Sequence, residues 1–286
     1  DCHKGVWRIG GRTLHDAHEF EILSVRDIIA FSSNIGVAQV AERLGPEGLY
    51  RALRAFGFGR PTGIELAGES AGILRPTSQW TRLSLSSLPM GQEVACSPLQ
   101  LVAGFCVFAN GGWYVRPRIV LGTADADGRK LLRRMPPSPR RRVLSQQTAD
   151  LMCSDIMAAV VERGTARRCA LDGYTMAGKT GTAQIARPNG GGYEEGAYTA
   201  AFVGIVPAQS PQFVIGVIAE RPGGKSYYGG VVAAPAASRM ADRILSLYRV
   251  ERIASRPTTR RASERSMALE RGQEMTRCRS AQEGET

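Results

Sequence analysis

The sequence predicts an α+β protein, with a mostly helical first part followed by an antiparallel sheet. Helix signals dominate up to about residue 110, whereas strand signals dominate from residue 174 onward. The length of 286 residues suits one large domain with a tail, and hydrophobic residues make up 43% of the chain, which is enough for a real core. A fibrous or membrane-embedded protein is therefore excluded.

Four helices are predicted in the first part, over residues 25–31, 35–44, 46–56 and 98–109. Ser24 and Asp27 resemble a capping box before the first of them. Gly45 ends the second helix and Pro46 opens the third, which is the usual placement of these residues at helix ends. The longest apolar runs, 101–109 and 200–208, reach about half the length of a bilayer span, so no membrane crossing is predicted.

A basic hairpin follows, with arms over residues 114–123 and 130–143 and a turn at Asp125–Gly128. Six Arg, one Lys and no acid lie between Arg129 and Arg142, a local charge of +7 in a chain whose net charge is +11. We interpret this segment as a solvated hairpin tip outside the chemistry, with an anionic polymer or lipid as the alternative partner. No aromatic residue is interleaved with these arginines, so no nucleic-acid partner is predicted.

The second part of the sequence predicts a helix, three strands and a final helix. Ser145 caps the first helix, Gly164 ends it, and its apolar stripe consists of Ala149, Met152, Ile156 and Val160. The strands cover residues 174–185, 198–206 and 212–220, and the final helix, 232–250, is expected to pack through Met240, Ile244 and Leu247. Apolar residues almost vanish from Glu251 on. We therefore expect one domain over residues 1–250 and a disordered Arg/Glu-rich tail over 251–286.

The segment Ala177–Gln184 is the strongest local motif, and it has two chemical interpretations. Gly173, separated by four residues from Gly178-Lys179-Thr180, satisfies the spacing of a phosphate loop. A phosphate loop must open a helix, because the helix N-terminus holds the phosphate. Thr182, Ala183 and Gln184 predict a continuing strand instead. A P-loop NTPase is therefore the weaker hypothesis.

The other interpretation is the Lys-Thr-Gly of serine acyl transferases that act on D-alanyl peptides and β-lactams. Lys179 supplies positive charge for a substrate carboxylate, and the Thr180 hydroxyl binds the same group. Gly181 leaves the strand bare, so an extended peptide can lie along its edge. The amide of Thr182 can then point at the developing oxyanion.

Ser32-Ser33-Asn34, between the first two predicted helices, is the second element of the candidate site. Alone it is weak, because Ser and Asn are ordinary helix caps. Together with Lys179 it matches the Ser-x-Asn of the same enzymes. Ser32 would then relay a proton, and Asn34 would hold the peptide amide.

From about Asp16 to Tyr248 the chain resembles the transpeptidase domain of class B penicillin-binding proteins, and it is most similar to the division type. The resemblance is carried by a series of motifs in order: Ser32-Ser33-Asn34, Phe56-Gly57-Phe58-Gly59, Met90-Gly91-Gln92, Pro98-Leu99-Gln100, Ala109-Asn110-Gly111-Gly112, Gly164-Thr165-Ala166, the Lys179 segment, Phe202-Val203-Gly204 and Tyr228-Gly229-Gly230. Ser97 is a small departure, since the family usually has Thr there.

The nucleophile is the large departure from the family pattern. Family members carry Ser-x-x-Lys upstream of Ser-x-Asn, and no Ser-x-x-Lys occurs in this sequence. We expect the chain to be a fragment truncated before Asp1, without the nucleophile helix and the membrane anchor, and inactive by itself. A degenerate, non-catalytic division scaffold is the alternative.

The resemblance implies a penicillin-recognising α+β fold, with a mainly antiparallel sheet between helices and a helical lobe that carries Ser-x-Asn. It implies peptidoglycan cross-linking, in which acyl groups pass from D-alanyl-D-alanine stem peptides to an amine and β-lactams inhibit. The implied location is extracytoplasmic on a membrane-anchored protein, with cell-wall synthesis or division membrane proteins as partners. A β-lactam sensor or β-lactamase is a further alternative.

No metal or organic cofactor is implied. Cys2, His3, His15 and His18 crowd near the start of the chain, but no second ligand pair exists, so zinc is the weaker hypothesis there.

Overall fold

The computed structural model describes residues 1–187, 190–224 and 226–252. Residues Asp1–Val250 form one compact unit. The predicted disordered tail lies, apart from its first two residues, outside the described part of the chain.

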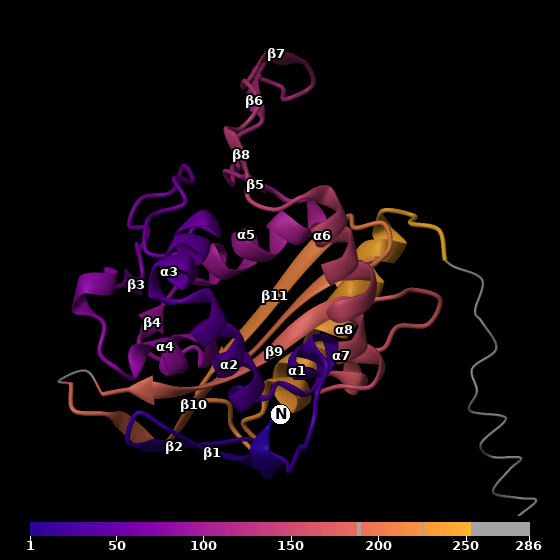
Figure 1. Ribbon diagram of the computed structural model, residues 1–286. Coiled ribbons are helices and arrows are strands. Elements are labelled where there is room, and N and C mark those ends of the chain that lie inside the picture. The colour runs from indigo at the N-terminus through magenta and orange to yellow at the C-terminus, as the bar shows by residue number, and fades with distance from the viewer. Residues whose placement is uncertain (188–189, 225, 253–286) are drawn as a thin grey trace, which may run out of the picture. The chain divides into compact units, whose positions relative to one another are not determined.

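A three-stranded antiparallel sheet lies at the centre of this unit, in the order β11-β10-β9 (Figure 1). The strands are β9 (Ala177–Ala186), β10 (Tyr193–Val206) and β11 (Phe213–Glu220). They agree with the three predicted strands and their antiparallel pairing. Beyond β9 no described strand continues the sheet, so β9 presents a free edge.

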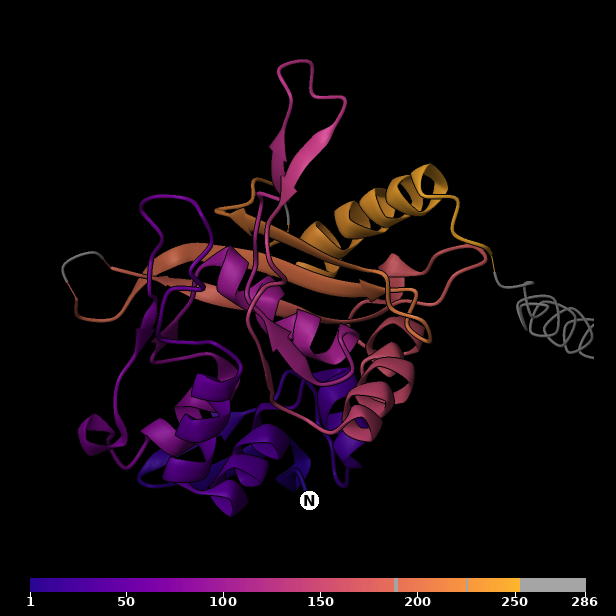
Figure 2. The same cartoon turned by 90° about the horizontal axis from the view of Figure 1, so that it is seen from above.

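Helices cover both faces of this sheet (Figure 2). Side chains alternate along β10, so that buried Phe202 and Val206 pack with α8 (Gly229–Leu247) on one face. On the other face Ile205 joins a cluster that includes Phe105 and Phe108 of α5 (Pro98–Ala109). The α+β prediction is therefore confirmed as three layers, helix, sheet and helix.

The predicted early helices are present as α1 (Val25–Phe31), α2 (Asn34–Leu44), α3 (Pro46–Ala55) and α5. Ser24 accepts a hydrogen bond from the Asp27 amide, which caps α1 as predicted. Shorter elements complete the helical lobe: β1 (Val6–Ile9), β2 (Arg12–His15), β3 (Ile73–Leu74), α4 (Ser84–Ser87), β4 (Val94–Ala95) and 3₁₀ turns at His3–Gly5, Thr77–Gln79 and Leu88–Met90.

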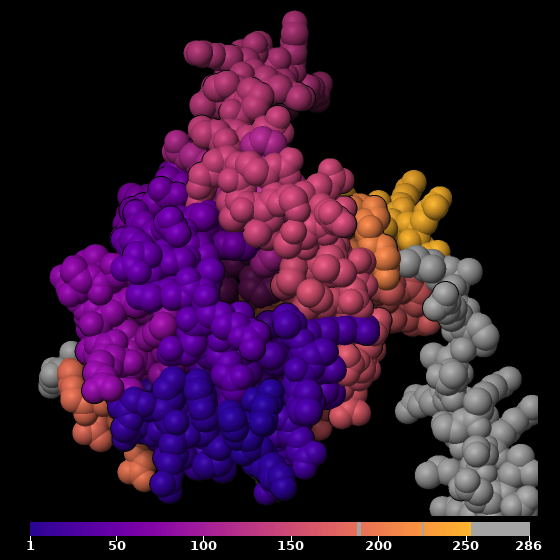
Figure 3. Space-filling view, viewed as in Figure 1, coloured from indigo at the N-terminus to yellow at the C-terminus, as the bar shows by residue number. Residues whose placement is uncertain are grey.

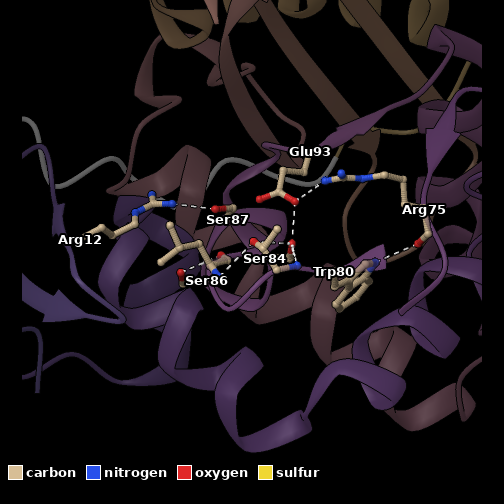
Figure 4. A network of polar contacts seen from close by, with 9 residues as sticks. Arg12, Arg75, Trp80, Ser84, Ser86, Ser87 and Glu93 are labelled. Carbon is tan, nitrogen blue, oxygen red and sulfur yellow. Dashed lines mark hydrogen bonds and ion pairs between the residues drawn. The ribbon is translucent and has the colours of Figure 1, made fainter. Parts of the chain in front are cut away.

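A partly buried polar network links the segment after α3 to the β1–β2 hairpin (Figure 4). Glu93 accepts hydrogen bonds from the Arg75 guanidinium at 2.5 Å and from the Ser84 hydroxyl at 2.7 Å. The Arg12 guanidinium donates to Ser87 Oγ at 2.6 Å, which joins the β1–β2 hairpin to α4. Buried polar groups satisfied in this way hold one conformation, so the Met90-Gly91-Gln92 motif has a fixed position in the lobe.

The helix predicted after Ser145 is divided into three stretches: α6 (Gln146–Leu151), a π-helical turn (Met152–Ile156) and α7 (Ala158–Glu162), followed by a 3₁₀ turn at Arg167–Cys169. The Met157 amide bonds the Met152 carbonyl, five residues back, which inserts one extra residue into the turn. The insertion rotates the buried face, so Cys153 and Met157 are fully buried, while Met152 packs against the same cluster and Ile156 is half-buried. The predicted stripe is therefore incomplete, because it leaves out Cys153 and Met157.

The packing face predicted for the last helix is also partly wrong. Helix α8 begins at Gly229, and Met240 and Leu247 are 46% and 76% exposed. Small residues form the buried face instead, with fully buried Ala233, Ala234, Ala237, Ala241 and Leu245. Alanines let the helix approach the sheet closely, and a search for large apolar residues overlooks such a face.

The predicted basic hairpin is present and protrudes from the molecule (Figures 1 and 3). It has two paired parts: β5 (Trp113–Val115) with β8 (Arg140–Arg142), and β6 (Gly122–Ala124) with β7 (Leu131–Arg134). The Gly128 amide bonds the Asp125 carbonyl at the predicted turn.

Arg140, Arg141 and Arg142 lie in the β5–β8 pairing and not at the hairpin tip, contrary to prediction, although Arg140 and Arg142 are exposed. Strand pairing places the guanidinium groups of Arg140 and Arg142 at 4.7 and 4.4 Å from the Trp113 ring centre, and that of Arg141 at 4.1 Å from Tyr114. The aromatic partners come from the opposite strand, so a search within the arginine run misses them.

Candidate active site

The Lys-Thr-Gly motif lies on β9, the edge strand of the sheet. Lys179 is paired with Val203, Thr180 with Phe202 and Gly181 with Ala201. The strand continues to Ala186, so no helix begins after Thr180, and the phosphate-loop hypothesis is contradicted by this geometry. Residues 181–184 are all exposed, which leaves this part of the strand accessible to a ligand.

Lys179 reaches across to the Ser32 turn. Its ammonium donates a hydrogen bond to Ser32 Oγ at 2.8 Å and another to the Thr180 carbonyl at 3.1 Å. Burial of the ammonium lowers the pKa of Lys179 from 10.5 to about 8. The fold therefore brings together two predicted site residues that are 147 positions apart in sequence.

Ser32 occupies a constrained position at the end of α1. Its φ of 59° and ψ of 47° are left-handed, which is uncommon for a residue other than glycine. Next to it, buried Ser33 caps α2 by accepting from the Gly36 amide at 2.9 Å. Such a conformation persists when its surroundings determine it, and it is common at functional sites.

Asp16 holds this turn from the side of β2. One carboxylate oxygen accepts from the Ser33 hydroxyl at 2.6 Å, and the other accepts from the Ile35 amide at 3.0 Å. No sequence pattern pointed to Asp16 as part of the site, because it acts through contacts with a turn that lies 16 residues and more further along the chain.

Asn34 is the first residue of α2 and lies beside the Ser32 turn. Its side-chain amide donates to the His15 carbonyl at 2.9 Å. The Asn34 side chain is thereby oriented by the end of β2. Its predicted contact with a peptide substrate stays a prediction.

The two threonines of the motif have different partners. Thr180 Oγ1 lies 2.7 Å from Thr165 Oγ1, and Thr182 Oγ1 accepts a hydrogen bond from the Gly229 amide at 3.1 Å. A Cβ atom on Gly229 would lie 2.2 Å from the Ala201 carbonyl oxygen. Glycine is therefore required where α8 begins, since only a bare backbone approaches β9 and β10 this closely. Thr165 was predicted only as part of a motif, without a role in the site.

The backbone amides of β9 point alternately to the two sides of the strand. The Gly178 amide bonds the Met157 carbonyl, which lies outside β10. Because the direction alternates along a strand, the amides of Thr180 and Thr182 point to that same side, away from β10. The free edge of β9 thus offers donors to a ligand.

Cys2 and His3, two of the residues considered for the zinc hypothesis, contact other side chains of the protein. Cys2 is buried, with its sulfur 3.5 Å from Ser33 Oγ, and the His3 ring stacks on Trp7. Among the described residues, no group of three His, Cys, Asp or Glu side chains is arranged to hold a metal ion. In the same part of the chain no helix is long and apolar enough to span a bilayer.

A helix-covered antiparallel sheet, with a Lys-Thr-Gly edge strand joined to a Ser-x-Asn turn of a helical lobe, is the penicillin-recognising α+β fold. Residues 3–242 match the model of the penicillin-binding protein transpeptidase domain. The chain belongs to this family.

The chain is 38% identical over 226 residues to penicillin-binding protein PbpB of Mycolicibacterium smegmatis, with coverage of 76% of this chain and 35% of that protein. It is 32% identical over 231 residues to the probable peptidoglycan D,D-transpeptidase PbpC of Pseudomonas aeruginosa. This alignment covers 81% of this chain and 38% of that protein. The crystal structure of penicillin-binding protein 3 from Mycobacterium tuberculosis with ampicillin superposes with a TM-score of 0.79 at 34% identity, over 88% of this chain and 57% of that one. The chain thus spans little more than a third of these curated relatives.

Proposed function

We propose that this chain forms one side of the active site of a serine-type peptidoglycan D,D-transpeptidase that also binds β-lactams. The observation that carries the proposal is the 2.8 Å contact between Lys179 and Ser32, which joins Lys-Thr-Gly to Ser-x-Asn. Membership of the transpeptidase family supports the proposal. The Pseudomonas aeruginosa relative, which is described as a probable peptidoglycan D,D-transpeptidase, supports it as well.

In the proposed reaction a serine of a Ser-x-x-Lys segment, outside residues 1–286, attacks the penultimate D-alanine carbonyl of a stem peptide and forms an acyl ester. The C–N bond to the terminal D-alanine breaks, and its nitrogen takes up the proton that the serine hydroxyl gives up, which Ser32 and Lys179 are placed to relay. An acceptor amine then attacks the ester, forms the cross-link and gives its proton to the serine oxygen, which regenerates the hydroxyl.

The free edge of β9 is proposed to bind the substrate. A stem peptide would lie along it as an added strand, with its terminal carboxylate near Lys179 and Thr180. With a pKa of about 8, Lys179 is mostly charged at pH 7 and attracts that carboxylate. The outward amide of Thr182 would stabilise the oxyanion that forms at the attacked carbonyl.

Location and partners are part of the same proposal. Cross-linking of the cell wall takes place outside the cytoplasm, so this domain would be extracytoplasmic on a membrane-anchored protein. Membrane proteins of wall synthesis or division would be its partners. A β-lactamase would hydrolyse the acyl ester rapidly, and a scaffold would not form it, so acylation kinetics separate these alternatives.

The proposal is tested with Lys179→Ala in a polypeptide extended upstream through the proposed Ser-x-x-Lys segment. Loss of charge at an acyl-transfer site is expected to lower acylation by a fluorescent penicillin by about 100-fold or more. Lys130→Ala, on the exposed hairpin, is the matched control and should retain the wild-type rate. Wild-type labelling in Lys179→Ala would contradict the proposal. Saturable binding of Mg²⁺-ATP that requires Lys179 would contradict it as well.

A further inference from the structure

A pocket of about 320 Å³ lies at the base of the protruding hairpin, where β5 and β8 join the segment after α3. Four arginines line it: Arg60, Arg116, Arg140 and Arg141. It shares no residue with the Ser32 and Lys179 site. The proposed function gives this concentration of positive charge no role.

Contacts with neighbouring backbone and aromatic rings orient these guanidinium groups. Arg141 donates to the carbonyls of Arg54 and Ala55 at the end of α3 and stacks on Tyr114. Arg116 Nε donates to the Gly63 carbonyl at 2.5 Å. These bonds use one edge of each group, and a guanidinium has five N–H donors, so donors remain for a ligand.

Two carboxylates, those of Glu65 and Glu69, interact electrostatically with Arg116 and balance part of the positive charge of the cluster. Among the described residues, no carboxylate forms a salt bridge with any of the four arginines. Burial, and then the like charge of Arg60, lowers the pKa of Arg141, which shows that the two groups lie close enough to repel. The Glu69 oxygens also accept hydrogen bonds from the Thr62 and Gly63 amides at 2.8 and 2.9 Å.

We propose that this pocket binds a phosphate group, either of a free phosphate compound or of an anionic polymer. The lining arginines come from three segments of the chain. The Arg140 guanidinium stacks over Trp113, whereas those of Arg60, Arg116 and Arg141 each bond backbone carbonyls through one nitrogen. The remaining N–H groups of these three arginines can therefore meet the oxygens of a tetrahedral oxyanion from several directions. A carboxylate, which is planar, presents its oxygens along one edge only. Tyr114 and two prolines in the wall, Pro61 and Pro139, supply the apolar surface on which a sugar ring or an alkyl link can lie.

The test is calorimetric titration of the chain at about 0.15 M salt, where interactions between distant surface charges are screened. Two probes distinguish the sources of phosphate: inorganic pyrophosphate and an oligomer of glycerol phosphate. The test variant is Arg60→Gln/Arg116→Gln, because each of these arginines donates a single hydrogen bond to a backbone carbonyl. The matched control is Arg133→Gln/Arg134→Gln, which removes the same charge from exposed positions on β7.

We expect saturable binding of at least one probe, weakened about tenfold or more in the pocket variant and less than about twofold in the control. Preference for pyrophosphate indicates a free phosphate ligand, and preference for the oligomer indicates a polymer. Equal weakening in both variants would show non-specific attraction and overturn the proposal. Absence of saturable binding to the wild type, or equal binding of poly-glutamate by the same arginines, would also overturn it. Thermal unfolding of each variant shows whether its fold is intact. Arg60→Gln alone is the milder change and is measured in the same way.

Discussion

Ser32 is left-handed at the end of α1, and the Asp16 carboxylate holds the turn that follows it. Asp16→Asn keeps the size of the side chain but removes the negative charge that the Ser33 hydroxyl contacts. We therefore expect the turn to loosen and the acylation rate constant of β-lactams to fall by about tenfold, while their initial binding constant changes little. Stopped-flow labelling of the extended polypeptide separates the two constants. Equal rates in Asp16→Asn and wild type would exclude a positioning role.

Lys179 is expected to lower the free energy of unfolding, although it is part of the candidate site. A pKa lowered from 10.5 to about 8 means that burial disfavours the charged form by about 3 kcal/mol. Since the Ser32 hydrogen bond offsets part of this cost, Lys179→Met should raise the free energy of unfolding by about 2 kcal/mol at pH 7.

The pH dependence follows from the lowered pKa. Between pH 8 and 10.5 the unfolded chain binds more protons at Lys179 than the folded protein does, so wild-type stability rises with pH relative to the variant. The advantage of Lys179→Met should therefore be constant below pH 8 and shrink above it. Urea unfolding at pH 7, 8 and 9 measures the difference. A growing advantage above pH 8 would contradict the assigned cause.

Part of the candidate site could be predicted from local sequence. Lys179 and Ser32 stand in short motifs whose chemistry depends on residue type, and the fold brings them to 2.8 Å. Asp16 and Thr165 could not be predicted in the same way, because their roles depend on contacts with distant segments. A carboxylate at the end of a short strand has no sequence signature.

At the scale of elements, the start of α8 is packed directly against β9, the strand that carries Lys-Thr-Gly. A Cβ atom on Gly229 would meet the carbonyl oxygens of Ala201 and Gly181 at 2.2 and 2.4 Å. Gly229→Ala should therefore displace the helix start, break its bond to Thr182 and destabilise the fold by about 2–4 kcal/mol. Gly223→Ala, where no atom lies within 4 Å of the added carbon, is the control. Equal melting temperatures would show that α8 is not in close contact.

The hairpin base and the hairpin tip are expected to differ in stability effects. Arg141→Gln removes the bonds to the end of α3 and the contact with Tyr114, and should cost about 1–3 kcal/mol. Arg133→Gln, at an exposed position of β7, should change stability by less than about 0.5 kcal/mol. Urea denaturation tests both. We expect neither folded variant to change penicillin acylation by more than about twofold, because neither residue touches Lys179 or Ser32.

Element positions were more predictable from sequence than element faces. Caps and glycines placed α1, α2 and α5 within one residue, since those signals are local. The buried face of α8 could not be predicted from large apolar residues, because most of its contact surface consists of alanines. The π-helical turn at 152–156 could not be predicted either, because one inserted residue does not change the composition of the segment.

For the whole molecule, the resemblance stated from ordered motifs is confirmed by the family match over residues 3–242. Composition alone could not have given it, because α+β proteins of this size carry many functions. We propose, as the central claim, that the site containing Ser32 and Lys179 is completed by a serine from outside residues 1–286, because no Ser-x-x-Lys occurs within them.

Peptide mass spectrometry after labelling with a fluorescent penicillin tests that claim most directly. The measurement compares residues 1–286 with a polypeptide extended upstream through a Ser-x-x-Lys segment. We predict no covalent adduct on residues 1–286, and in the extended polypeptide a single adduct on the serine of Ser-x-x-Lys that depends on Lys179. An adduct on Ser32, or on any other residue of the chain alone, would contradict the account.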